Sequence, residues 1–145
     1  MSRVDFYILP ESERVERFAC SVTAKAWRAG NRVHIHTSDA DSANMMDDLL
    51  WTFRDISFVP HEQMDHDVDE ETPVTIGHGE AYPGGTDVLV NLDKVIPTFS
   101  NEFSRIVEIV GGSKESKTLA RQRYRDYKNS DFEIHDHKLD LPSKS

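Results

Sequence analysis

Apolar positions in the first third of the chain follow a strand, helix, strand pattern. The segment Val4 to Leu9, continuously apolar after Asp5, is typical of a strand that is covered on both faces. Pro10 ends this strand, and apolar residues then recur at helical spacing from Glu13 to Ala29. Gly30 suits the end of that helix, and Arg32 to His36 follows as the next strand. Such a β-α-β unit normally makes its two strands parallel.

Helices and strands continue to alternate through the rest of the chain. Two further helices are predicted, from about Asp41 to Phe53 and from Lys114 to Lys128. The acidic segment His61 to Thr72 is expected to be a solvated loop, and the polar residues from Lys138 a frayed tail. The remaining predicted strands are Pro73 to Ile76, Asp87 to Leu92, Phe103 to Val110 (or a short helix running into a strand) and Phe132 to His135. The pattern favours an α/β fold with a mostly parallel central sheet and helices on both faces.

The composition fits one globular domain over residues 1–145, of which 37% are apolar. The single cysteine, Cys20, excludes an internal disulfide and a cysteine-based zinc site, and we expect it to pack in the core. No apolar run approaches the roughly 18 residues that a membrane span requires. The N-terminus lacks the apolar stretch of a signal peptide. We therefore expect a cytoplasmic protein.

The most informative charge pattern lies in the last predicted helix. The chain carries a net charge of −9, but six bases and two acids give Lys114 to Lys128 a charge of +4, which leaves −13 for the rest. On a helical wheel of roughly 100° per residue, five of the bases and one tyrosine share a sector. This basic stripe consists of Lys114, Lys117, Arg121, Tyr124, Arg125 and Lys128, whereas Leu119, Ala120 and Tyr127 are placed toward the core.

The basic stripe has the chemistry of an anion-binding surface. A solvated helix face is the alternative, but Lys117, Arg121 and Arg125 are four residues apart, and like charges at that spacing repel. Arginine can hold a carboxylate through two hydrogen bonds, and a tyrosine ring supplies an apolar wall. The stripe therefore suits an acidic peptide, a terminal carboxylate or a nucleic-acid strand with a stacked base.

Six motifs stand out along the chain: Phe6-Tyr7-Ile8-Leu9, Ala26-Trp27-Arg28-Ala29-Gly30-Asn31-Arg32-Val33, Leu50-Trp51, Ser57-Phe58-Val59-Pro60-His61, Asp87-Val88-Leu89-Val90-Asn91-Leu92 and Leu119-Ala120-Arg121-Gln122-Arg123-Tyr124-Arg125-Asp126-Tyr127-Lys128. Their order and spacing resemble the chi subunit family of bacterial DNA polymerase III over nearly the whole chain. The resemblance implies a Rossmann-like, three-layer fold without nucleotide chemistry, catalytic residues, cofactor or metal. It implies an adaptor that binds the acidic C-terminal tail of single-stranded DNA-binding protein. It also implies binding to the psi subunit, which links chi to the clamp loader, or in some bacteria to a repair helicase.

The same resemblance places two binding surfaces on this sequence. The family's psi-facing surface maps onto the aromatic residues Trp51 and Phe58, with Val59 and Pro60 beside them. Partly exposed aromatic side chains often anchor interfaces, although core packing is the alternative here and for Tyr124. The family's tail-binding site maps onto Val110, Lys117, Arg121, Tyr124 and Arg125, and the helical wheel adds Lys114 and Lys128 as longer-range cations.

Three other functions compete with this interpretation. A nucleotide site is disfavoured because the turn after the first strand, Pro10-Glu11-Ser12-Glu13, contains two acids and no glycine. Gly111-Gly112-Ser113-Lys114 lacks the spacing of a Walker motif. A metal site is disfavoured because His34/His36 and His135/His137 accompany no metalloprotease motif, so surface histidines among acids are the preferred explanation. Direct binding of single-stranded DNA through Tyr124 remains open, but the acidic remainder of the protein would repel a long polyanion.

Overall fold

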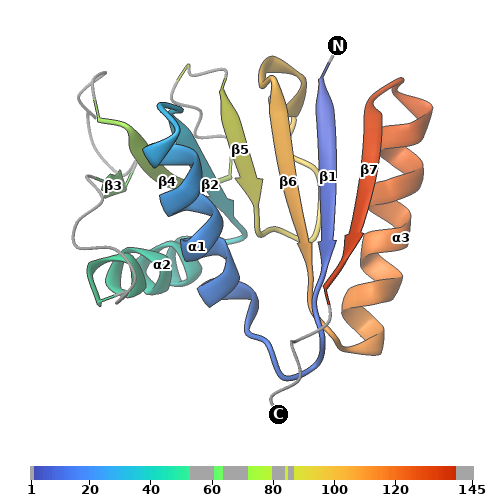
Figure 1. The fold of residues 1–145 in the computed structure, drawn as a ribbon, viewed down its shortest axis with the longest axis horizontal. Helices are drawn as coiled ribbons and strands as arrows, with labels where there is room; N and C mark the ends of the chain where they lie inside the picture. Colours follow the sequence, from blue (N-terminus) through green and yellow to red (C-terminus); the bar gives the residue numbers. More distant parts are fainter. Residues whose placement is uncertain (1, 53–60, 64–71, 80–83, 85–86, 140–145) are drawn as a thin grey trace.

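The computed structural model describes residues 2–52, 61–63, 72–79, 84 and 87–139. Its sheet has seven strands in the order β3-β4-β2-β5-β6-β1-β7, and every pairing in the described part is parallel (Figure 1). The predicted α/β class is therefore confirmed. The strands are β1 (Arg3–Ile8), β2 (Val33–Thr37), β3 (His61–Gln63), β4 (Val74–His78), β5 (Val88–Asn91), β6 (Arg105–Val110) and β7 (Glu133–Lys138). The helices are α1 (Val15–Arg28), α2 (Ala40–Thr52), the short 3-10 helix η1 (Ser100–Glu102) and α3 (Lys114–Asn129).

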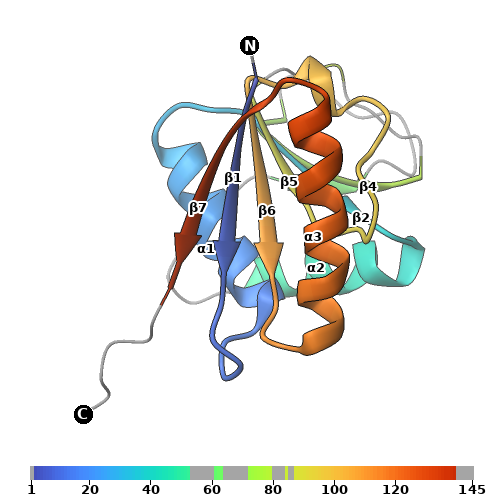
Figure 2. The same cartoon turned by 90° about the vertical axis from the view of Figure 1, so that its right-hand side faces the viewer.

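The helices cover both faces of the sheet, as the sequence predicts. Helices α1 and α2 contribute to one buried cluster, which includes Cys20 and Met46. Helix α3 lies on the opposite face from α1 (Figure 2), in a second cluster that includes Phe6 and Tyr127. Side chains alternate between the two faces along β1, so that Val4 and Phe6 face α3 while Tyr7 packs beside α1. Strand β1 therefore contributes to both clusters.

Three local predictions are wrong. Part of the expected loop at His61 to Thr72 is strand β3, because His61–Gln63 pairs with β4 at the edge of the sheet. The last strand is longer than expected and ends at Lys138, and the Leu139 amide donates to the Ile8 carbonyl oxygen at 2.9 Å, so the chain is still ordered where a frayed tail is predicted. His34 and His36 are not surface histidines, because both lie on the central strand β2 and are 1% and 2% exposed.

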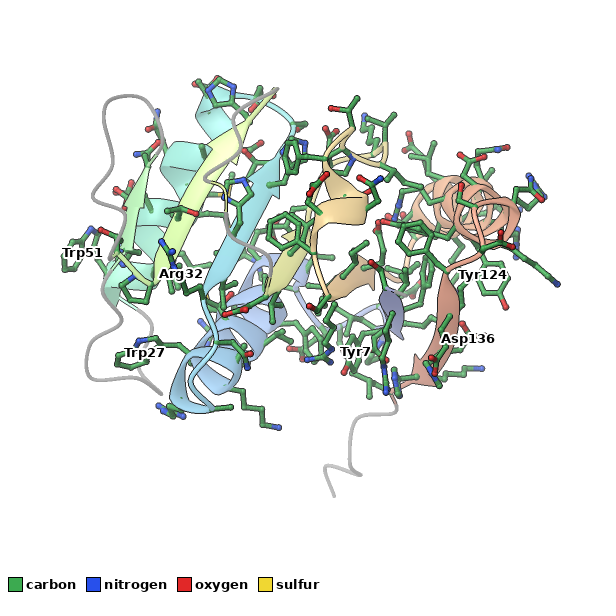
Figure 3. The ribbon with its side chains drawn as sticks, turned by 90° about the horizontal axis from the view of Figure 1, so that it is seen from above. Tyr7, Trp27, Arg32, Trp51, Tyr124 and Asp136 are labelled. Carbon is green, nitrogen blue, oxygen red and sulfur yellow. The ribbon has the colours of Figure 1, made fainter. Side chains whose placement is uncertain are left out.

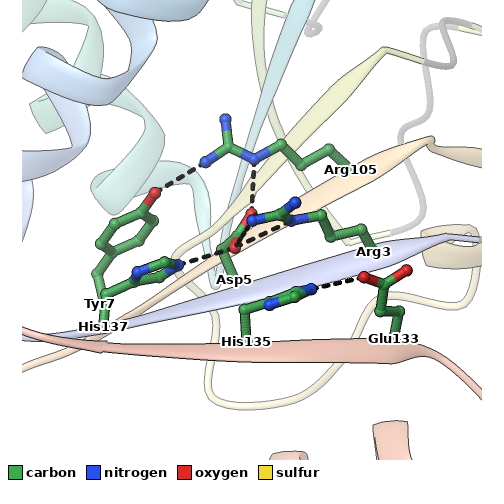
Figure 4. A network of polar contacts seen from close by, with 7 residues as sticks. All are labelled: Arg3, Asp5, Tyr7, Arg105, Glu133, His135 and His137. Atoms are coloured by element: carbon green, nitrogen blue, oxygen red, sulfur yellow. Dashed lines mark hydrogen bonds and ion pairs between the residues drawn. The ribbon is translucent and has the colours of Figure 1, made fainter.

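A fully buried carboxylate, Asp5, organises the face of β1 that adjoins α1 (Figure 4). It accepts hydrogen bonds from Arg105 Nε at 2.7 Å and from Arg3 Nη2 at 3.0 Å, and it pairs with His137 Nε2 at 2.9 Å. Arg105 also donates to the Tyr7 hydroxyl at 2.8 Å. Burial acts to raise the pKa of Asp5, but the bonds from Arg3, His137 and Arg105 outweigh it and lower the pKa to about 2.

This depressed pKa predicts an acid-sensitive contribution of Asp5 to stability. A carboxyl whose pKa is lower in the folded state stabilises above its unfolded pKa, near 4, and loses that effect as the pH falls through about 2. We expect wild type to lose about 1–2 kcal/mol more than Asp5→Asn between pH 4 and pH 2 in urea unfolding. Asp48→Asn, on an exposed residue of α2, is the matched control and should follow wild type. Parallel stability curves for wild type and Asp5→Asn would contradict the assignment.

Candidate functional site

Helix α3 is attached to the sheet through a second buried carboxylate, Glu108 on β6. Glu108 is 0% exposed and accepts hydrogen bonds from Arg123 Nε at 2.9 Å, the Tyr127 hydroxyl at 2.6 Å and Asn91 Nδ2 at 2.8 Å. Arg123 also donates to the Lys94 carbonyl oxygen at 3.2 Å. Burial raises the pKa of Glu108, while the charge of Arg123 and these hydrogen bonds favour its ionised form. The network fixes which face of α3 points inward.

The opposite face of α3 presents the basic stripe. Ser113 precedes the helix, and its hydroxyl oxygen accepts a hydrogen bond from the Ser116 amide at 3.1 Å, a typical N-terminal cap. Arg123 and Tyr127 are buried on the side that faces the sheet, whereas Lys117 and Arg121 are exposed. The side chains of Lys114, Arg125 and Lys128 are also exposed. The predicted orientation of the stripe is therefore confirmed, and Arg123 is the one base of the helix that does not contribute to its surface charge.

A pocket of about 220 Å³ opens where this face of α3 meets β1 and β6. Its floor is apolar, and the Phe6 ring lies 5.5 Å from the Tyr124 ring, centroid to centroid. Lys117 and Arg121 line the pocket from the helix, and Asp136 lines it from β7. The complete lining is Phe6, Ile8, Val110, Lys117, Ala120, Arg121, Tyr124 and Asp136. Two cations beside an apolar floor can hold an anionic group attached to an apolar side chain.

The structure brings together four of the seven residues predicted for tail binding. Val110, Lys117, Arg121 and Tyr124 all line the pocket. Arg125 lies outside the lining, and its Nη2 donates to Gln122 Oε1 at 3.2 Å. Lys128 is exposed in the last turn of the helix, and Lys114 occupies the first.

Four lining residues were not predicted from the sequence. Phe6 and Ile8 alternate with the residues of β1 that face α1, so a two-residue period could have placed them beside α3. Ala120 was expected in the core, and it is buried while it also lines the pocket. Asp136 was missed because the last strand was predicted to end at His135.

The second predicted surface is described only at Trp51. Its side chain is 58% exposed on α2, so the expected partial exposure is confirmed. Its ring lies 4.6 Å from that of His61, which in turn pairs with Asp47 at 3.1 Å. Trp51 and the pocket residue Tyr124 lie at opposite ends of the molecule (Figure 3). Phe58, Val59 and Pro60 lie outside the described residues.

The regions considered for nucleotide or metal binding have packed environments. A Cβ atom at Gly112 would lie 2.5 Å from the Cα of Glu11, so the turn after β6 rests on the turn after β1. His34 pairs with Thr75 at 2.8 Å and His36 with Asp93 at 3.0 Å. Among the residues that the structure describes, no group of three histidine, cysteine or acidic side chains could hold a metal ion. A search of the same residues finds no helix long and apolar enough to cross a membrane.

Comparisons with known proteins show which family the sequence matches. A family model described as "DNA polymerase III chi subunit, HolC" matches residues 1–135. A protein of Pseudomonas aeruginosa named DNA polymerase III subunit chi is 36% identical over 141 residues, which cover 96% of this chain and 98% of the relative. Proteins of the same name from Haemophilus influenzae and Escherichia coli are 36% and 30% identical, over 83% and 92% of this chain and 85% and 96% of their own lengths. The chain belongs to the DNA polymerase III chi subunit family.

Proposed function

We propose that this protein is a non-catalytic adaptor of DNA replication that binds the acidic C-terminal tail of single-stranded DNA-binding protein. The tail would end in the pocket between α3 and β1. Through its Trp51 surface the protein would bind psi and so reach the clamp loader. The observation that carries the proposal is that Lys117 and Arg121 stand beside an apolar floor in one pocket.

The chemistry of the pocket matches the end of an acidic chain. A C-terminal residue with an apolar side chain carries its carboxylate directly beside that side chain. Arg121 and Lys117 can bind the carboxylate while Phe6, Val110 and the Tyr124 ring contact the apolar group. The exposed cations Arg125 and Lys128 continue along α3 and attract the acidic residues that precede the terminus.

The charge distribution favours a short peptide over a nucleic-acid strand. Outside Lys114 to Lys128 the protein carries −13, which opposes the approach of a long polyanion. A short tail needs only the local field of the basic stripe. Direct binding of single-stranded DNA through Tyr124 is the alternative function, and it makes a different prediction in the experiment below.

A titration with a fluorescent peptide that ends in Asp-Asp-Ile-Pro-Phe tests this proposal. We expect salt-sensitive binding that is weakened at least tenfold when the terminal carboxylate is amidated, because the amide cannot accept the charged hydrogen bonds. A single-stranded oligonucleotide should not bind at the same concentrations. Equal affinity for the free and the amidated peptide would show that the terminal carboxylate is not recognised. Binding of the oligonucleotide would favour the alternative function.

Trp51 is expected to anchor the second partner, psi or a repair helicase. Its exposed indole on α2 has the character of an interface anchor, and Phe58, Val59 and Pro60 are predicted to flank it. Trp51→Ala should weaken binding of that partner by about 30-fold or more, as hot-spot truncations do. The affinity for the tail peptide should not change. Pull-down and calorimetry with purified psi measure the first effect. Val95→Ala, a truncation of another exposed apolar side chain, is the control. Loss of both activities together would contradict the separation of the two surfaces.

A further inference from the structure

Asp136 gives the pocket a charge of the opposite sign to its two cations. It lies on β7, one of the two edge strands of the described sheet, and is paired in register with Phe6 on β1. The Phe6 ring forms part of the floor and contacts Tyr124. Asp136 therefore stands at the strand-side rim, across the apolar floor from the helix that carries Lys117 and Arg121. Tyr124 and Asp136 are found at the same end of the molecule in Figure 3.

This acid is not needed to hold the fold together. Asp136 is exposed, and no hydrogen bond or ion pair of its side chain is found within the described part of the chain. Asp5 on β1 and Glu108 on β6 differ in this respect, because both carboxylates are fully buried and paired. Lys138 follows on the same strand, in register with Ile8, but it does not line the pocket.

The asymmetric charge determines where a second carboxylate could go. The α-carboxylate of a terminal residue can face the helix and its two cations, and the side chain of that residue then covers the floor toward β7. An apolar side chain is stabilised there by burial. An acidic side chain would lie on apolar surface beside Asp136, and both the desolvation and the like charge would disfavour it.

We propose that Asp136 is a specificity-determining residue that keeps acidic side chains out of the pocket, so that only an apolar terminal residue is accepted. The acidic residues of the tail are then confined to the exposed cations along α3. This inference rests on the proposed function, because it concerns which residue of the same tail enters the same pocket.

The test compares two peptides on three proteins. The peptides are the one that ends in Asp-Asp-Ile-Pro-Phe and a second in which the terminal residue is Glu, both with free carboxylates. The proteins are wild type, Asp136→Asn and Glu133→Gln. The last is the matched control, because it also removes one negative charge from β7 but on the face turned away from α3. The thermal midpoints of all three should agree, since both residues are exposed.

We expect wild type to bind the peptide that ends in Phe more tightly than the peptide that ends in Glu. Asp136→Asn should reduce the ratio of the two dissociation constants about two- to fivefold, the range for a single exposed charge pair. Glu133→Gln should leave the ratio of the two dissociation constants unchanged. An unchanged ratio in Asp136→Asn, or an equal change in both variants, would overturn the inference while wild-type binding to the Phe peptide keeps the proposed function intact. Absence of that wild-type binding would overturn both.

Discussion

Replacing Glu108 by alanine should lower the free energy of unfolding by about 3–5 kcal/mol. The substitution removes the acceptor of three hydrogen bonds and leaves the Arg123 guanidinium charged and without its carboxylate in a buried site. Water cannot readily replace that partner, because Arg123 is 7% exposed and Tyr127 is 1% exposed. Urea unfolding followed by circular dichroism measures the change. This is the largest stability effect that we expect from any single charged residue of the domain.

A double-mutant cycle separates the ion pair from simple loss of volume. Arg123→Ala should also destabilise strongly, but the double variant should cost clearly less than the two single changes together, because neither charge is then left alone. Glu115→Ala on the exposed side of α3 is the control, with an expected change within about 0.5 kcal/mol. A loss below about 1 kcal/mol for Glu108→Ala would show that α3 is held in another way.

Replacing Arg121 by alanine should weaken binding of the acidic tail peptide at least tenfold. Arg121 lines the pocket and can form charged hydrogen bonds with the terminal carboxylate, each of which contributes about 1.5–3 kcal/mol. The folded domain should be unaffected, because the side chain is exposed and outside the Glu108 network. Isothermal titration calorimetry at low salt gives the affinity and the thermal midpoint gives the control for folding.

Arg125→Ala is the matched control for charge. It removes the same group from the same helix one turn later, at a position outside the pocket lining. We expect Arg125→Ala to lower the affinity for the tail peptide about two- to fivefold, and this difference from wild type should disappear at high salt, as for other exposed charges. Equal effects of the two variants would mean that the tail is held by the general field of the basic stripe and not by the pocket.

The sequence predicts the chain order of the secondary structure well because several of the buried parallel strands, such as β5 and β6, are rich in apolar residues. It also places the basic stripe correctly, since helical periodicity alone decides that Lys117, Arg121 and Tyr124 share a face. These three residues of the stripe, and Val110 with them, could be assigned to the pocket because the family's tail-binding site maps onto them.

The residues that were misjudged depend on contacts between distant segments. In the sequence Arg123 is one of six bases in the last helix, and its buried position follows only when β6 brings Glu108 beside it. A signal was available, because Glu108 is a lone carboxylate among apolar residues of a strand and a buried charge requires a partner. Asp136 was missed for another reason. The final strand continues past His135 because β1 offers it a complete parallel partner up to Ile8, which local sequence does not reveal.

The most direct test of the account is to map where the acidic tail peptide binds, by titrating it into 15N-labelled protein and following amide chemical shifts. We expect the largest changes at the pocket, on α3 at Ala120, Arg121 and Tyr124 and on the strands at Ile8 and Val110. The Trp51 indole and amide should be unchanged, because they lie at the other end of the molecule. Saturable changes centred on Trp51, or none along α3, would contradict the central claim that this pocket is the tail-binding site.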